Sequence, residues 1–279
     1  MHRLLRTGCC EPAAMMPRRS SARPMALLSS WADWQGRHAV VPPRGGANME
    51  QMTEHVFGVQ SGDLTAYLLV LPESVTLIDA GFPGSAPLVE DALRALGRKV
   101  TDLRDVLVTH CHPDHAGGLA EIKRLTGAEA WMHQLDADMV RRGLAFREYY
   151  PAPGEKNRAF VEEVVKNGPQ TFEPVEVEHE VSPDEVIPVA GGITAVHTPG
   201  HSAGHLCFLW PGDGGVLFTG DAANNVEGLN EPPIHEDRPL LLGSLRRLGG
   251  LEFEVACFAH GGPIVGSAAR AFREKWGAE

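Results

Sequence analysis

Four side chains of the kinds that bind metal ions lie within six residues of this sequence of 279 residues. They are His110, His112, Asp114 and His115, in a loop between a predicted strand and a predicted helix. Two histidines spaced two apart on extended backbone point the same way and can hold one ion, whereas Asp114 and His115 can turn toward a second. One tetrahedral zinc ion cannot take all four and stay open to substrate, so we expect further ligands elsewhere.

Three more potential ligands follow predicted strands farther along the chain. His201 comes after a Thr-Pro-Gly run, Asp221 after Phe-Thr-Gly, and His260 after Cys-Phe-Ala. Imidazole nitrogens bind zinc and a carboxylate can bridge two metals, so this set suits a pair of divalent ions. Ions about 3.5 to 4 Å apart share a hydroxide that is nucleophilic at neutral pH, so the pattern predicts hydrolysis. Zn²⁺ is the expected metal, with Mn²⁺ or Fe²⁺ as alternatives.

The elements that position these residues can be read from the apolar pattern. Residues 64–71 and 75–78 are predicted strands of a hairpin, and 105–108 is a buried strand before the histidine-rich loop. Ser85 is a predicted N-cap for a helix over 88–96, and a second helix covers 119–125 and ends at Gly127. Further strands are expected at 128–132, 175–180, 186–189, 193–196, 206–210, 216–219 and 255–258, and further helices at 135–142, 239–248 and 267–276. Residues 149–174 have no clean period and are interpreted as an insertion that covers part of an α/β unit of two or four layers.

The run from Thr109 resembles the signature Thr-His-x-His-x-Asp-His-x-x-Gly of the metallo-β-lactamase superfamily. The later Thr-Pro-Gly-His, Thr-Gly-Asp and Ala-His-Gly blocks are similar to that family's other motifs, in the same order, and the resemblance covers about residues 54–276. It implies a four-layer αββα sandwich. It also implies that His110, His112 and His201 hold one ion, that Asp114, His115 and His260 hold the other, and that Asp221 bridges them.

Departures within the family narrow the expected activity. True β-lactamases of this fold have no bridging Asp, whereas this chain has Asp221 at that position. The resemblance therefore favours the branch with glyoxalase II, thioesterases, lactonases and phosphodiesterases. Only 19 residues, 261–279, follow the last ligand, which argues against the helical glutathione-binding domain of glyoxalase II. Acyl-homoserine lactonases carry a Tyr three residues after the bridging Asp, where this chain has Asn224; Tyr149 or Tyr150 are possible substitutes.

Other polar residues have more than one interpretation. Asp79 either accepts a hydrogen bond from a metal-binding imidazole or stabilises a turn. His205 is expected to support the site or the fold, His133 and His235 to be solvated, and Cys111 to pack on the opposite side from its neighbours. Asn224 either donates to an oxyanion of the substrate or stabilises a turn.

Composition and charge exclude several classes of function. The net charge of −11 disfavours nucleic acid as a partner, and the longest apolar stretch, residues 64–71, is far shorter than the ~20 residues a membrane helix needs. Residues 1–48 hold seven Arg and two acids, so they carry +5 and the remainder −16. We expect 1–48 to be a disordered or mis-started extension and 49–279 to be the hydrolase domain. Five cysteines without a paired spacing favour a reducing compartment, the cytoplasm.

The sequence therefore predicts a dinuclear zinc hydrolase that cleaves a small ester, thioester or lactone, with Asp114 as a possible proton relay. A small molecule is the expected partner, and the oligomeric state is open. Two alternatives are a mononuclear iron sulfur dioxygenase on the same fold, which generally does not use a second ion, and a non-catalytic metal-binding module.

Overall fold

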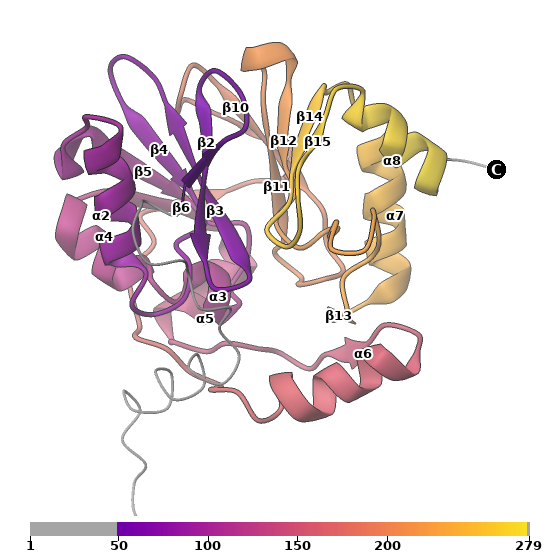
Figure 1. Ribbon diagram of the computed structural model, residues 1–279. Coiled ribbons are helices and arrows are strands. Elements are labelled where there is room, and N and C mark those ends of the chain that lie inside the picture. Colours follow the sequence, from indigo (N-terminus) through magenta and orange to yellow (C-terminus); the bar gives the residue numbers. More distant parts are fainter. Residues whose placement is uncertain (1–48, 278–279) are drawn as a thin grey trace, which may run out of the picture.

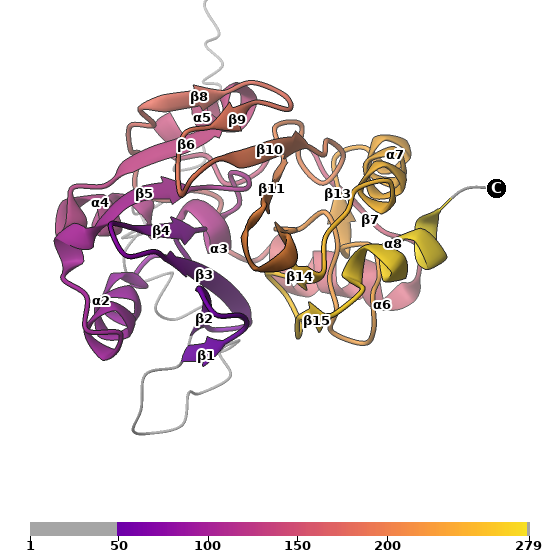
Figure 2. The same cartoon turned by 90° about the horizontal axis from the view of Figure 1, so that it is seen from above.

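The computed structural model describes residues 49–277, and the expected extension 1–48 lies outside them. Over the described range the chain forms two facing β-sheets with helices on their outer sides, which confirms the αββα sandwich (Figures 1 and 2). Helices α2 and α4 cover one outer side, and α7 and α8 cover the opposite one.

The first sheet is built from the N-terminal half, with strand order β1-β2-β3-β4-β5-β6-β8. Strands β4, β5, β6 and β8 are parallel, and β1 to β4 are joined as antiparallel neighbours. Its strands are β1 (Met49–Gln51), β2 (Val56–Ser61), β3 (Leu64–Val70), β4 (Val75–Ile78), β5 (Leu103–Leu107), β6 (Glu129–His133) and β8 (His179–Val181). All four residues of β4 are buried, because layers cover both faces of the sheet.

The second sheet has the order β15-β14-β12-β11-β10-β9, and a separate two-stranded sheet pairs β13 with β7. Their strands are β7 (Tyr150–Pro151), β9 (Val186–Ile187), β10 (Ile193–His197), β11 (Leu206–Trp210), β12 (Val216–Phe218), β13 (Ile234–His235), β14 (Val255–Cys257) and β15 (Ile264–Val265). The predicted strand at 175–180 is wrong in its bounds. Pairing with β6 begins only where Trp131 meets His179, so just His179–Val181 forms β8.

Helices follow the strands closely, as the apolar spacing predicts. They are α2 (Ala86–Ala95), α3 (Pro113–Ala116), α4 (Leu119–Thr126), α5 (Gln134–Arg141), α6 (Glu155–Phe160), α7 (Arg238–Gly249) and α8 (Ala268–Trp276), with short turns η1 (Val100–Asp102), η2 (Val161–Val165) and η3 (Gly212–Gly214). Helix α4 ends at Gly127, whose φ of 76° is left-handed and free of strain only for glycine. Ser85 precedes α2 as expected, but its hydroxyl bonds Ser61 Oγ at 2.7 Å and does not cap the helix.

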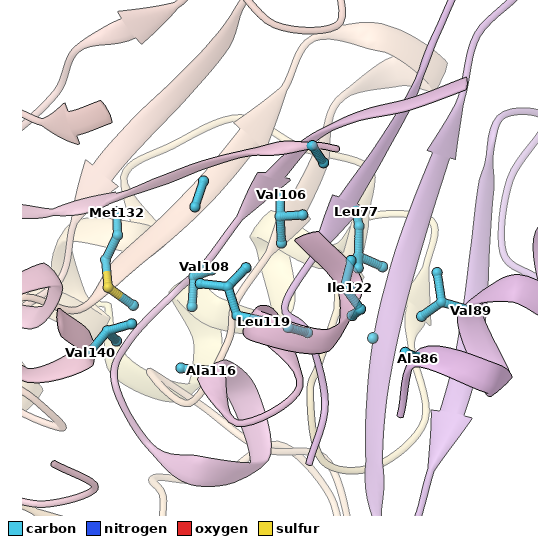
Figure 3. Close-up of a cluster of buried hydrophobic side chains, with 14 of the residues drawn as sticks. Leu77, Ala86, Val89, Val106, Val108, Ala116, Leu119, Ile122, Met132 and Val140 are labelled. Carbon is cyan, nitrogen blue, oxygen red and sulfur yellow. The ribbon is translucent and has the colours of Figure 1, made fainter. Parts of the chain in front are cut away.

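Three buried apolar clusters fill the spaces between the four layers. The first lies under α2, α4 and α5 and includes Leu77, Val89 and Ile122 (Figure 3). The second lies between the two sheets around Phe208 and Phe218, and the third lies under α7 and α8 around Phe258. Truncating one such side chain to Ala costs about 2 to 5 kcal/mol, so these clusters keep the strand ends in fixed relative positions.

The insertion lies at one edge of the sandwich. It contains β7, α6 and η2, and Figure 1 shows α6 beyond the edge at which α3 and β13 are found. A small cluster of Val161, Val165 and Ile234 packs with Phe146 and Tyr149 and attaches this segment to the body.

None of the helices within 49–277 is long and apolar enough to cross a bilayer. Cys111, Cys207 and Cys257, the cysteines in this range, are free and buried.

Candidate metal centre

Both sheets deliver the candidate ligands from the carboxyl ends of their strands. The run from His110 follows β5, and His201 follows β10. Asp221 follows β12, and His260 follows β14. Pro113 begins α3 directly after His112, and its fixed φ suits the first turn of a helix, which is how Asp114 and His115 turn away from the strand direction.

Three buried histidines converge on one point. His201 Nε2 lies 3.1 Å from His110 Nε2 and 3.0 Å from His112 Nδ1. The edge of a tetrahedron with metal–nitrogen bonds of 2.0 to 2.1 Å is about 3.3 Å. The three nitrogens are therefore spaced as three corners of a site for one ion. Asp221 completes this group, whose potential ligand atoms all lie within 4.8 Å of one another.

A second group, Asp114, His115 and His260, lies beside the first. Asp114 Oδ2 is 3.6 Å from His115 Nε2 and 3.3 Å from His260 Nε2. Asp221 faces both groups, because its Oδ2 is 3.4 Å from His201 Nε2 while its Oδ1 is 3.4 Å from His115 Nε2. The structure thus brings together all seven residues that the sequence singled out, with Asp221 between the two sets.

Two buried atoms in this cluster lack a hydrogen-bond partner. Within residues 49–277, His115 Nε2 and Asp221 Oδ1 are among the few buried side-chain atoms that make no hydrogen bond. Leaving such atoms unpaired costs about 1 to 3 kcal/mol each. A divalent cation between them would satisfy both, so the residues present fit a metal centre on their own chemistry.

The outer nitrogens of these imidazoles are held by protein oxygens. His115 Nδ1 lies 2.8 Å from Asp79 Oδ2, and His201 Nδ1 lies 2.9 Å from the carbonyl of Ile234. His260 Nδ1 donates to the carbonyl of Asp63 at 3.2 Å. A proton on Nδ1 leaves the Nε2 lone pair directed at the centre, which is how ligating histidines are usually oriented. Of the two interpretations of Asp79, contact with an imidazole is therefore the observed one.

His205 holds the backbone of Asp221. Its Nε2 accepts a hydrogen bond from the Asp221 amide at 3.1 Å, so its Nδ1 carries the proton and donates to Thr198 Oγ1 at 2.8 Å. His205 is expected to support the site or the fold, and these two hydrogen bonds show it holding the backbone at Asp221.

Sequence reasoning missed Asp136, a fully buried carboxylate on α5. It accepts hydrogen bonds from the Cys111 amide at 3.2 Å, between two candidate ligands, and from Ser202 Oγ at 2.6 Å, next to a third. Arg147 compensates its charge at 2.8 Å. No signal in the sequence relates Asp136 to these two loops, because the contacts join segments far apart in the chain.

Burial and local charge divide the histidines into two classes. Burial, followed by repulsion from neighbouring imidazoles, holds the pKa of His110 and of His112 well below the usual range. Burial would also lower the pKa of His260, but Asp221 and Asp114 outweigh it and raise that pKa to about 10. The pKa of His115 is likewise raised, mainly by Asp114 and Asp79 against burial. The second group is thus a strongly negative environment that favours cations.

Several sequence predictions need correction or qualification. His133 and His235 are buried, not solvated: His133 accepts the Leu135 amide at the start of α5 and stacks on His197 at 4.5 Å. Asn224 Nδ2 donates to the Glu231 carbonyl and its Oδ1 accepts from the Val226 amide, so the side chain holds its own loop. Cys111 is buried in the first apolar cluster, as expected.

Tyr149 and Tyr150 do not act as substitutes for the missing lactonase tyrosine. Tyr149 packs against Phe146 in the insertion cluster, and Tyr150 pairs with β13 with its side chain exposed. Neither lines the cavity at the centre.

A third acidic and histidine group, Glu54, His55 and Asp213, lies outside this centre. Asp213 already accepts hydrogen bonds from Thr53 Oγ1 at 2.5 Å and from the His55 amide at 3.0 Å, and His55 Nδ1 lies 2.8 Å away. Since Asp213 is satisfied by Thr53 and His55 and Glu54 is exposed, the set is interpreted as a structural link between the loop before β2 and η3.

A cavity of about 910 Å³ opens directly onto the two groups. His112, Asp114, Asp221 and His260 line its floor, and residues of the insertion line one wall. The segment predicted to cover part of the α/β unit therefore lines the cavity at this centre.

The chain is similar to known proteins both in sequence and in fold. A family model described as the metallo-beta-lactamase superfamily matches residues 62–260. The probable metallo-hydrolase YflN of Bacillus subtilis (strain 168) is 27% identical over 241 residues, 80% of this chain and 89% of that protein. The atrochrysone carboxyl ACP thioesterase AgnL7 of Paecilomyces divaricatus is 28% identical over 239 residues, 82% of this chain but 62% of that one. A solved metallo-beta-lactamase with a HARLDQ motif from Cronobacter sakazakii has the same fold, with a TM-score of 0.61, 23% identity and 81% of each chain covered.

Proposed function

The chain belongs to the metallo-beta-lactamase superfamily, and we propose that it is a metal-dependent hydrolase that cleaves small esters, thioesters or lactones with two zinc ions. The residue range 49–279 forms the hydrolase domain in this proposal. Its main support is the position of Asp221, whose two oxygens face two separate groups of imidazole and carboxylate ligands.

In this proposal His110, His112 and His201 would hold the first ion, Asp114, His115 and His260 would hold the second, and Asp221 would serve both. When bound, two such ions lower the pKa of water toward about 7 and polarise a carbonyl oxygen. The ligand set contains His and Asp but no thiolate. Such a set suits zinc and also admits manganese or iron.

The protein's own residues supply positioning and proton transfer. The cavity admits the substrate on one side of the ligands, and its apolar lining limits water near the scissile bond. Asp114 lines the cavity among the candidate ligands, which places its carboxylate within reach of the departing oxygen or sulfur for passing a proton.

The names of similar proteins support an ester or thioester bond as the target. Relatives named as thioesterases and as a hydroxyacylglutathione hydrolase match large parts of this chain. The chain spans about half to three fifths of the length of those relatives, so their particular substrates are not carried over.

The two alternatives predict different metal contents. A mononuclear iron dioxygenase does not need the second group, yet Asp114, His115 and His260 are all in place with their atoms directed at one point. A binding module without turnover would keep its metals and hydrolyse nothing.

The test is metal analysis combined with a hydrolysis panel of aryl esters, thioesters, lactones and phosphodiesters on the full chain. We expect two zinc ions per chain and turnover of the carboxylic substrates. His112→Ala should lose at least one ion and about 10³-fold or more in kcat/KM, whereas His179→Ala, at a partly exposed histidine on β8, should match the wild type. Undiminished activity of His112→Ala, or one iron with oxygen uptake, would refute the proposal.

A further inference from the structure

Apolar side chains line one wall of the cavity at the candidate centre, next to the candidate ligand His112. The ring of Phe146 lies 4.7 Å from that of His112, centroid to centroid. Val165 and Phe160 of the insertion and Ile234 of β13 also line the cavity, and Phe82 and Leu88 contribute from the body of the protein.

The charged residues of the lining are almost all acidic. Besides the candidate ligands, it contains Asp63 and Glu155, and also Glu227 and Glu231, of which Glu231 is paired with Arg238 at 2.8 Å. Among the described residues of the lining, Lys156 is the one side chain with a fixed positive charge; it is 80% exposed and lies 2.7 Å from Glu227. A negatively charged substituent on a substrate therefore finds no unpaired cation in the cavity apart from the metals.

The size of the cavity indicates a substrate larger than an acetyl ester. A volume of about 910 Å³ is near the upper end of the ~300 to 1,000 Å³ that small-molecule sites usually have. Burying an apolar chain against Phe146 and Phe160 is favourable, whereas burying a carboxylate there without a partner is costly.

We infer that the substrate's acyl part is an uncharged, apolar chain or ring that lies along the wall of the insertion, and that acyl groups ending in a carboxylate are rejected. This inference rests on the proposed hydrolase function and adds the chemical class of the group that is released as an acid.

The decisive comparison uses pairs of substrates that differ in one terminal group. The p-nitrophenyl ester of hexanoic acid and the mono-p-nitrophenyl ester of adipic acid have the same acyl length, but the second ends in a carboxylate. On the zinc-loaded full chain we expect kcat/KM for the hexanoate to exceed that for the adipate on the order of 100-fold. Between acetate and hexanoate, kcat/KM should rise roughly threefold to fourfold per added methylene.

A binding measurement separates this inference from the proposed function. Hexanoyl hydroxamate and adipoyl monohydroxamate carry the same metal-binding head, and calorimetric titration compares them without turnover. We expect the neutral chain to bind at least tenfold more tightly. If no ester is hydrolysed but this difference holds, the proposed function fails and the inference about the pocket stands.

A matched pair of variants tests the wall itself. Phe160 and Leu240 are both apolar side chains that are partly exposed, but Phe160 lines the cavity and Leu240 does not. Phe160→Lys should lower the ratio of kcat/KM for the hexanoate to kcat/KM for the adipate at least tenfold. Leu240→Lys should leave this ratio unchanged. Equal or better handling of the adipoyl compounds by the wild type would overturn the inference.

Discussion

The carboxylate of Asp79 lies 2.8 Å from Nδ1 of His115 and also accepts the Thr109 amide at 2.8 Å. Asp79 itself has a φ of 62°, a left-handed conformation that aspartate adopts more readily than most residues other than glycine and asparagine. One carboxylate at the end of β4 therefore fixes both the ring of a candidate ligand and the start of the histidine-rich loop.

We expect Asp79→Asn to weaken the second ion selectively. The amide has the same shape, but it cannot orient and polarise the imidazole as a carboxylate does, and such losses usually cost about 10- to 100-fold in metal affinity. Metal titration of the dialysed protein should show one site of normal affinity and one weakened site. Asp91→Asn, at an exposed carboxylate of α2 paired with Arg94, is the control. Two unchanged sites in Asp79→Asn would contradict this role.

Asp136 lies behind the candidate ligands, and we expect it to stabilise the folded protein. Asp136→Asn removes a buried charge that Arg147 compensates and places an amide donor among four donors, so we expect a loss of about 3 kcal/mol in the free energy of unfolding. Metal affinity should also fall, because both ligand loops loosen. Asp138→Asn, two residues farther along and on the exposed side of α5, should change stability by less than about 0.5 kcal/mol. Urea denaturation of the three proteins measures the difference, and equal midpoints would exclude the assigned role.

His205→Phe keeps the ring volume and removes both hydrogen bonds of the imidazole. The Asp221 amide then loses its acceptor, so we expect about 1 to 3 kcal/mol of destabilisation and a weaker hold on the shared carboxylate. Zinc binding measured by competition with a chromogenic chelator should weaken, with His179→Phe as the control on β8. Wild-type zinc affinity in His205→Phe would show that Asp221 is positioned without it.

Removal of metal should lower the thermal stability of the wild type. Ions that bind only the folded chain stabilise it by RT ln(1 + [L]/Kd), which is about 4 kcal/mol at a thousandfold excess over Kd. We therefore expect a chelator to lower Tm by several degrees and added zinc to restore it. In His112→Ala the chelator should produce a smaller shift, because less metal is held. An equal shift in both proteins would mean that the stabilising ions bind elsewhere.

Asp213 provides a pH test away from the centre. Burial opposes ionisation of this carboxyl, but hydrogen bonds from Thr53 and His55 outweigh it and lower the pKa. A lowered folded-state pKa stabilises the fold above the unfolded pKa of about 3.9, and this stability is lost as the pH falls through the folded value. Asp213→Asn should therefore be less stable than the wild type by about 1 kcal/mol at pH 7. The difference should shrink below pH 4 in acid-unfolding curves; a gap independent of pH would point to packing instead of charge.

The sequence by itself determined the ligand types, their order and the elements that carry them. His110 and His112 share a side because side chains alternate along extended backbone, and α4 ends at Gly127 because glycine adopts left-handed φ without strain. These are local effects within a few residues, so they can be read from the chain directly. The αββα layers followed from the family resemblance that these motifs carry.

Only the tertiary structure decided which groups stand behind the ligands. Asp136 reaches loops 25 and 66 residues away in the chain, and His133 is buried because His197 from the other sheet stacks on it. The acidic, apolar character of the cavity likewise depends on an insertion without a regular pattern. Burial, charge compensation and hydrogen bonding are set by contacts between distant segments, and no local period in a sequence records which segments meet.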